Sequence, residues 1–135
     1  SERKIQESEG RFRILFEKMA QGVVYQNHLG QITHANPAAE RLLGLSLDQM
    51  QGRTSSNPEW HAIKADGSPF PGEEHPAMLA LKSCKSVFNV EMGVYHPKKR
   101  KHVWLMVNAE PEFREGETVP YQVFTTFSDI SQLKE

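Results

Sequence analysis

Residues 36–44, Asn-Pro-Ala-Ala-Glu-Arg-Leu-Leu-Gly, carry the clearest helix signals in this sequence. Asn36 is a good N-cap because its side-chain oxygen can accept a hydrogen bond from a free backbone N–H of the first turn. Pro37 suits the first helical position, and Gly44 suits the end of the helix. A second short helix follows, with Ser46 as its cap and Gly52 as its end. We therefore predict two consecutive short helices between residues 36 and 52.

A β-hairpin is predicted immediately before these helices. Its strands are the short apolar runs 23–25 and 32–35, and the turn 28–31 places Gly30 where a positive φ is needed. Upstream, residues 4–20 form an amphipathic pattern in which Ile5, Phe12 and Met19 are spaced by seven. This pattern fits a helix packed on its own domain, and it equally fits the end of a coiled coil that enters from upstream.

The last third of the sequence predicts three long strands, over residues 86–95, 102–110 and 121–128. Residues 53–72 carry little regular signal apart from the Asp66-Gly67 turn, and residues 73–83 predict a helix. In the strand 86–95 we take the apolar set as the inward face; it consists of Phe88, Val90, Met92 and Val94. Consecutive strands with hairpin links favour an antiparallel sheet with helices on one face, which is an α+β fold.

Composition places the chain among ordinary globular domains. It has 135 residues, 38% of them apolar and 24% charged, with a net charge of −1. This balance gives no general attraction to nucleic acid or to a membrane surface, so neither is expected as a partner. The single cysteine, Cys84, fits a reducing, cytoplasmic setting. Both ends are expected to continue in a longer parent protein, because Ser1 stands where an initiator methionine would.

Four phrases, in this order, resemble the PAS domain family. They are the hairpin with Gly22-Val23-Val24-Tyr25, the helical phrase from Asn36 to Gly52, the tryptophan-bearing strand 104–111, and Asp129-Ile130-Ser131 after the last strand. Leu45 stands where an aromatic residue is common in the family. The stretches 66–70 and 74–78 resemble a subgroup found in bacterial sensor kinases and cyclic-dinucleotide enzymes.

The resemblance implies a PAS fold: a five-stranded antiparallel sheet with short helices on one face and an N-terminal helix. We accordingly divide the chain into an amphipathic linker helix (1–20), the PAS domain (21–131) and the start of a C-terminal linker (132–135). The family resemblance also implies a signal-input domain of a multidomain sensor, such as a histidine kinase of a two-component system or a cyclic-dinucleotide enzyme. An output domain in the same chain and a homodimer are the expected partners.

A pocket beneath the sheet is the predicted ligand site, suited to a small apolar or aromatic molecule or to none. Trp60 lies in an irregular segment and either plugs the small core or forms one wall of the pocket. The other candidates lie on the three long strands: Met92, Leu105, Val107, Val123, Thr125 and Phe127. Asp129 is the candidate for signal relay, because its carboxylate can cap whatever follows the last strand.

Catalytic, metal and cofactor signatures are absent from the sequence. The six histidines lack metal-binding spacing, and His75 precedes Pro76 at a helix entrance, which argues against a haem ligand. The reactive-cysteine phrase of light-sensing relatives is missing, so flavin is not expected either. The run 98–101, Lys-Lys-Arg-Lys, is predicted to be a solvated hairpin tip. We expect a binding domain and no enzyme; the alternative is a ligand-free structural dimerisation module.

Overall fold

The computed structural model describes residues 10–134 except residue 12, so Ile5 and Phe12 of the N-terminal stripe lie outside the described residues. Five strands form one sheet: β1 (Gly22–Asn27), β2 (Ile32–Ala35), β3 (Val87–His96), β4 (Lys101–Glu112) and β5 (Gln122–Asp129). The order is β2-β1-β5-β4-β3, and every neighbouring pair is antiparallel. The expected α+β fold with a five-stranded antiparallel sheet is confirmed.

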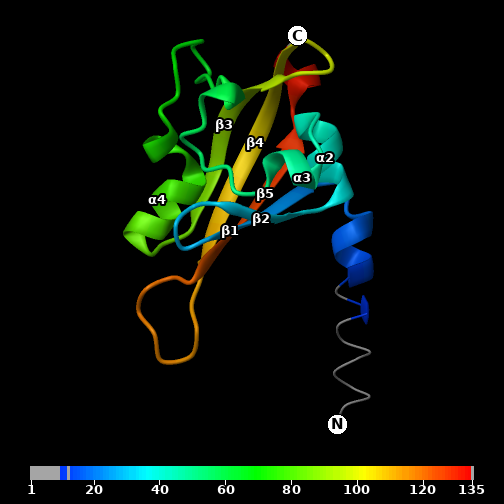
Figure 1. Cartoon of the computed structure of the whole chain (residues 1–135). Helices are drawn as coiled ribbons and strands as arrows, with labels where there is room; N and C mark the ends of the chain where they lie inside the picture. The colour runs from blue at the N-terminus through cyan, green and yellow to red at the C-terminus, as the bar shows by residue number, and fades with distance from the viewer. Residues whose placement is uncertain (1–9, 12, 135) are drawn as a thin grey trace.

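Short helices between β2 and β3 cover one face of the sheet (Figure 1). They are α2 (Pro37–Leu43), α3 (Leu47–Met50), the 3-10 turns η1 (Pro58–Trp60) and η2 (Gly72–Glu74), and α4 (Pro76–Ser83). A last 3-10 turn, η3 (Ser131–Lys134), follows β5. The main apolar core fills the space between these helices and the sheet, and a smaller cluster lies under α4.

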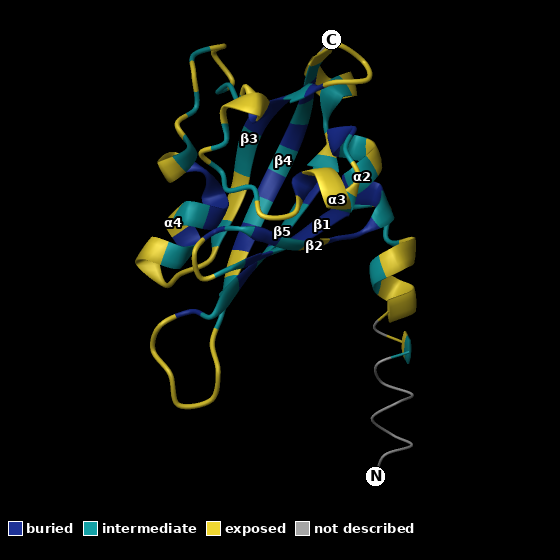
Figure 2. Cartoon of the chain, viewed as in Figure 1, coloured by how far each residue is buried: buried dark blue, intermediate teal, exposed yellow. Residues whose placement is uncertain are grey.

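The N-terminal segment is helical at residues 10, 11 and 13–18 and extends away from the sheet (Figures 1 and 2). Ile14 and Leu15 are exposed by 56% and 65%, whereas Phe16 is half-buried with its ring centroid 6.1 Å from that of Tyr25. Among the residues described, no helix is both long and apolar enough to span a membrane. The segment therefore touches its own domain through Phe16 and leaves apolar side chains uncovered.

Asn36 joins the sheet to α2 through both polar atoms of its side chain. Its side chain is fully buried, and its Oδ1 accepts hydrogen bonds from the backbone N–H groups of Val23 and Ala39, both at 2.9 Å. Its Nδ2 donates to the Gln21 carbonyl at 3.0 Å, and its backbone N–H donates to the Val23 carbonyl. The predicted N-cap is thus confirmed, and the same side chain also fixes β1.

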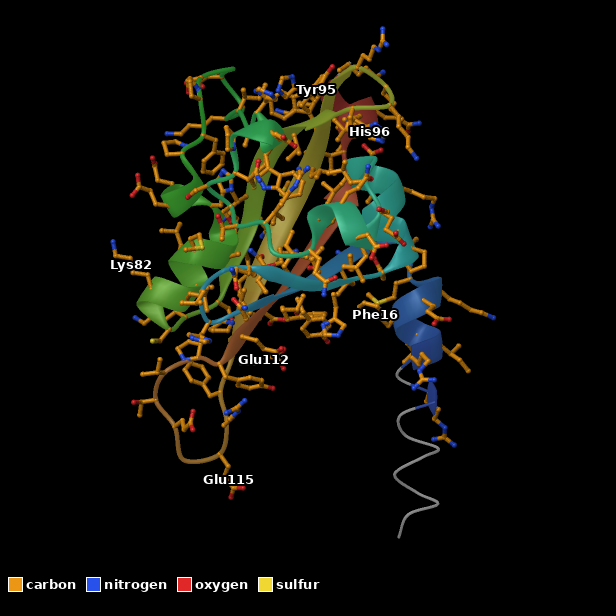
Figure 3. The ribbon with its side chains drawn as sticks, viewed as in Figure 1. Phe16, Lys82, Tyr95, His96, Glu112 and Glu115 are labelled. Carbon is orange, nitrogen blue, oxygen red and sulfur yellow. The ribbon has the colours of Figure 1, made fainter. Side chains whose placement is uncertain are left out.

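His96 fixes the other end of α2. It is buried at the end of β3, and its Nε2 donates to the Arg41 carbonyl at 3.0 Å while its Nδ1 accepts from the Lys99 backbone N–H (Figure 3). Gly44 ends α2 with a φ of +73°, and a Cβ there would lie 2.4 Å from the His96 ring. Gly44 therefore supplies both the left-handed backbone and the room that His96 needs.

The predicted inward face of the third strand is wrong at one residue. Phe88 is 56% exposed, whereas Met92 and Val94 are buried and Val90 packs on the core. The cause is a bulge between Val87 and Val90, which shifts the register with β4. A bulge adds a residue to one strand and reverses the alternation beyond it, so the simple period of two fails here.

The helical region before β3 needs one correction. The predicted helix 73–83 is divided at His75, because η2 ends before it and α4 begins at Pro76, which suits the first position of a helix. Trp60 ends the 3-10 turn η1. Ile63, three residues later, pairs with Gly93 at the edge of β3.

We expect Asn36→Ala to lower the free energy of unfolding by roughly 2–4 kcal/mol, because buried backbone groups lose their partners. Asn57→Ala is the matched control, since the Asn57 side chain accepts one hydrogen bond, from Glu59 N–H, in an exposed turn. Its cost should stay below about 1 kcal/mol. Urea unfolding of both variants measures the difference, and equal costs would contradict the structural role given to Asn36.

Candidate ligand cavity

A cavity of about 90 Å³ lies between the sheet and the helices. Val24 of β1, Ile32 of β2, Leu43 of α2 and Ala77 of α4 contribute to its wall. Most of the remaining lining comes from the inner face of β3, β4 and β5 and from the segment 54–62. The volume has room for several water-sized groups, since about 10–15 Å³ suffices for one. The core of this domain is therefore not completely filled.

Six of the seven predicted pocket residues line this cavity: Trp60, Met92, Leu105, Val107, Thr125 and Phe127. Val123 does not. It is fully buried and packs with Ala77, Ala80 and Ala109 in the smaller cluster under α4. It shares the inner face of β5 with Thr125 and Phe127, but it lies nearer the beginning of that strand.

Trp60 closes the cavity from the side of the irregular segment. Its exposed fraction is 8%, and its Nε1 donates to the Thr54 carbonyl at 2.9 Å. The Arg53 guanidinium lies 5.1 Å from the ring centroid, and it also forms an ion pair with Glu59 at 2.8 Å. Both suggested roles of this tryptophan are present together, since the ring packs on the core and forms a wall.

Two polar side chains, Gln26 of β1 and Thr125 of β5, lie diagonally to each other on neighbouring strands and line the cavity. Thr125 Oγ1 donates to Gln26 Oε1 at 3.3 Å, and Gln26 Nε2 donates to the Gly30 carbonyl at 2.9 Å. Gln26 follows Val24 on the same face of β1, a placement that the period of two could have revealed. The predicted strand ended at Tyr25, and Gln26 was missed for that reason.

His75 is a further polar lining residue outside the predicted set, as are Thr54 and Ser55. It is 6% exposed, it precedes α4, and its Nε2 lies 2.9 Å from the Phe70 carbonyl, so Nε2 carries the proton and donates. Burial lowers the pKa of His75 below its usual value of 6.5, against the opposing effects of the Phe70 hydrogen bond and of Glu74. The ring is therefore neutral at pH 7.

The described lining contains no aspartate, glutamate, lysine, arginine or cysteine. Cys84 is exposed just after α4, and in the described part of the chain no group of three His, Cys, Asp or Glu side chains could hold a metal ion. Charged side chains such as Lys82, Glu112 and Glu115 lie toward the outside (Figure 3). The cavity therefore offers apolar contact and a few neutral hydrogen-bonding groups.

The residues after β5 fold back onto β4. Asp129 Oδ1 accepts from the Ser131 N–H at 2.8 Å, and Ser131 Oγ accepts from the Trp104 N–H at 3.1 Å. The Ile130 N–H also donates to the Trp104 carbonyl. Asp129 thus caps the 3-10 turn η3. Trp104 is the chain neighbour of Leu105, which lines the cavity.

Comparison with known proteins agrees with this architecture. A family model of the PAS domain matches residues 10–74, from the N-terminal segment to η2. A PAS domain from Colwellia psychrerythraea superposes with a TM-score of 0.69 at 20% identity, over 91% of this chain and 97% of that one. The chain has the PAS fold.

Two further solved structures with the PAS fold come from sensor proteins. A domain of a sensory box sensor histidine kinase/response regulator from Geobacter sulfurreducens gives a TM-score of 0.68 at 14% identity, over 93% of this chain and 96% of that one. The LOV domain of a blue-light activated histidine kinase from Erythrobacter litoralis superposes with a TM-score of 0.65 at 16% identity. The match covers 85% of this chain and 100% of that one. No curated protein sequence matches the chain.

The lowered pKa of His75 predicts a pH dependence of stability. The folded state favours the neutral ring, so the unfolded state binds the proton more readily, and stability falls as the pH decreases below about 6.5. His75→Gln keeps a donor for the Phe70 carbonyl but does not titrate. In urea unfolding between about pH 5 and 8, the free energy of unfolding of the wild type should therefore fall more steeply with decreasing pH than that of His75→Gln. The two slopes should differ by at most ~1.4 kcal/mol per pH unit. Parallel curves below pH 6.5 would contradict this.

Proposed function

We propose that the chain is a signal-input PAS domain of a multidomain sensor, such as a histidine kinase or a cyclic-dinucleotide enzyme. The observation that carries the proposal is the apolar cavity in the core, whose wall includes Leu105 and Val107 of β4. A small apolar or aromatic molecule would gain about 25 cal/mol for each Å² of apolar surface that it buries there. The sensor proteins among the structural neighbours support this function.

The proposed signal leaves through β4 and the segment after β5. Leu105 faces the cavity, and its neighbour Trp104 holds the backbone of Ile130 and the side chain of Ser131. Lys134 adds an ion pair with Glu91 and lies 4.9 Å from the Trp104 ring centroid. A ligand that displaces Leu105 would move Trp104 and, with it, the start of the linker to an output domain in the same chain.

The domain would act by binding and not by catalysis. A neutral, mostly apolar lining supplies no activated nucleophile and no pair of acid and base groups for proton transfer. The exposed position of Cys84 gives no support to a flavin adduct in the cavity. We place the domain in the cytoplasm as part of the same proposal, with neither nucleic acid nor membrane as a partner.

A structural dimerisation module is the second candidate, and the exposed Ile14 and Leu15 of the N-terminal segment favour it. Apolar side chains left uncovered on a helix are suited to a partner helix. This function requires no ligand, so the two candidates differ in whether the cavity is occupied. Dimerisation is also compatible with sensing.

Native mass spectrometry of freshly purified protein tests the sensing function. We expect an added small-molecule mass on the wild type and its loss in Val107→Phe, because the new ring would occupy the cavity. Met106→Phe is the matched control on the opposite face of β4, where the side chain is half-exposed, and it should keep the bound mass. An empty wild-type dimer would instead support the structural module.

Asp129→Ala in the full-length protein should uncouple the output from the signal while the domain's unfolding midpoint stays unchanged. The substitution removes the acceptor that orients Ser131, whereas Asp129→Asn keeps an oxygen there and should retain coupling. Asp66→Ala is the matched control, because Asp66 accepts a similar bond from Ser68 N–H in a distant exposed turn. A normal output response from Asp129→Ala would refute the relay.

A further inference from the structure

A second hollow of about 250 Å³ lies directly beside the cavity, between the segments 55–62 and 69–75. We call it the outer pocket. Ser55, Trp60, Ala62 and His75 line both spaces, so these four residues form a common wall. Because Trp60 closes the cavity on this side, one molecule reaches both spaces only if it displaces part of this wall.

The two spaces differ in chemistry. The cavity is mostly apolar, and its pair Gln26 and Thr125 is already engaged in hydrogen bonds. The outer pocket is bordered by hydrogen-bonding side chains, among them Ser56, Asn57 and His61. The described lining of both spaces lacks carboxylate, ammonium and guanidinium groups. Next to His75, which is buried, a ligand charge would lose its hydration without gaining a counter-charge, which is unfavourable.

His75 presents an acceptor at the common wall. Its Nε2–H is used by the Phe70 carbonyl, and a neutral ring then leaves a lone pair on Nδ1. Within the described part of the chain no hydrogen bond reaches Nδ1, and no described buried side-chain nitrogen or oxygen is left without a partner. Nδ1 therefore retains accessible surface and can accept a hydrogen bond from a ligand.

We propose that the ligand is a single uncharged amphipathic molecule whose apolar end fills the cavity, whose polar end lies in the outer pocket, and whose hydroxyl or amide N–H donates to His75. This inference rests on the proposed sensing function and narrows it to one chemical class. The small cavity limits the apolar end to a group of several heavy atoms, such as one aromatic ring. His75 is the residue that distinguishes such a molecule from a plain hydrocarbon.

Four probes with the same ring test the proposal by NMR titration of the wild-type domain: benzyl alcohol, toluene, benzoate and benzylammonium. Toluene should shift the backbone amide signals of cavity residues such as Val107 and Thr125. Benzyl alcohol should shift these and also the signals of Asn57 and Gly72 in the outer pocket. Benzoate and benzylammonium should bind at least about tenfold more weakly than benzyl alcohol, because an unpaired charge is costly to bury.

Variants then test the hydrogen bond. For each probe, the affinity for the variant is compared with the affinity of the same probe for the wild type. His75→Leu should weaken benzyl alcohol by up to about tenfold and leave toluene unchanged, in line with the loss of one neutral hydrogen bond. His75→Gln supplies another acceptor and should restore part of the affinity. His28→Leu is the matched control, since His28 is exposed in the turn after β1 and lines neither space, and it should change neither probe.

The outcomes distinguish a failure of the amphipathic-ligand proposal from a failure of the proposed sensing function. If benzyl alcohol and toluene shift the same cavity signals alone, or if His75→Leu weakens both equally, the amphipathic class is wrong while a sensing cavity remains. If no probe shifts a cavity signal and the purified protein carries no bound mass, the sensing function itself is wrong. The wild-type titration gives this answer even if His75→Leu does not fold.

Discussion

The fully buried side chain of Asn36 is the constraint on which the arrangement of sheet and helices depends. It bonds at the same time to Gln21 and Val23 before β2 and to Ala39 in α2. A helix as short as Pro37–Leu43 is not stable alone in water, so its position follows from its two ends. Asn36 fixes the first end and His96 the last, and Leu43 is thereby held at the border of the cavity.

The opposite wall of the cavity is held differently. The segment 54–75 contains only short 3-10 turns, and it is tied to the sheet by the paired backbone hydrogen bonds of Ile63 and Gly93 at the edge of β3. A Cβ on Gly93 would lie 2.7 Å from the Ile63 side chain, so a glycine is needed for this approach. The wall formed by α2 is thus anchored by buried side chains, whereas the segment 54–75 is anchored by backbone hydrogen bonds at the edge of the sheet. We expect the segment 54–75 to be the wall that adjusts to a ligand.

Features that depend on residues close together in the sequence could be predicted, whereas features that depend on distant segments could not. The caps Asn36 and Ser46 and the helix end Gly44 act within a few residues, so their signals are local and were identified. Phe88 was misplaced because the bulge beside it depends on pairing with β4. The position of His75 could not be predicted because it depends on how the irregular segment before α4 folds, with the Phe70 ring centroid 4.8 Å from that of His75. Val123 lies on the same face of β5 as the cavity residues Thr125 and Phe127, but α4 covers that part of the strand. The alternation of side chains shows which face a residue lies on and not where along the strand the cavity ends.

The alternation of side chains also connects the cavity in the core with both ends of the domain. Leu105 and Val24 line the cavity, and their neighbours Trp104 and Tyr25 project from the other face of the sheet. Tyr25 contacts Phe16 of the N-terminal segment, and Trp104 holds the residues after β5. A single peptide unit therefore separates the ligand-facing surface from each terminal segment. Under the proposed sensing function, a ligand would shift those segments only by the difference in its affinity for two arrangements of these strands, and the fit at Leu105 and Val24 would determine the size of the response.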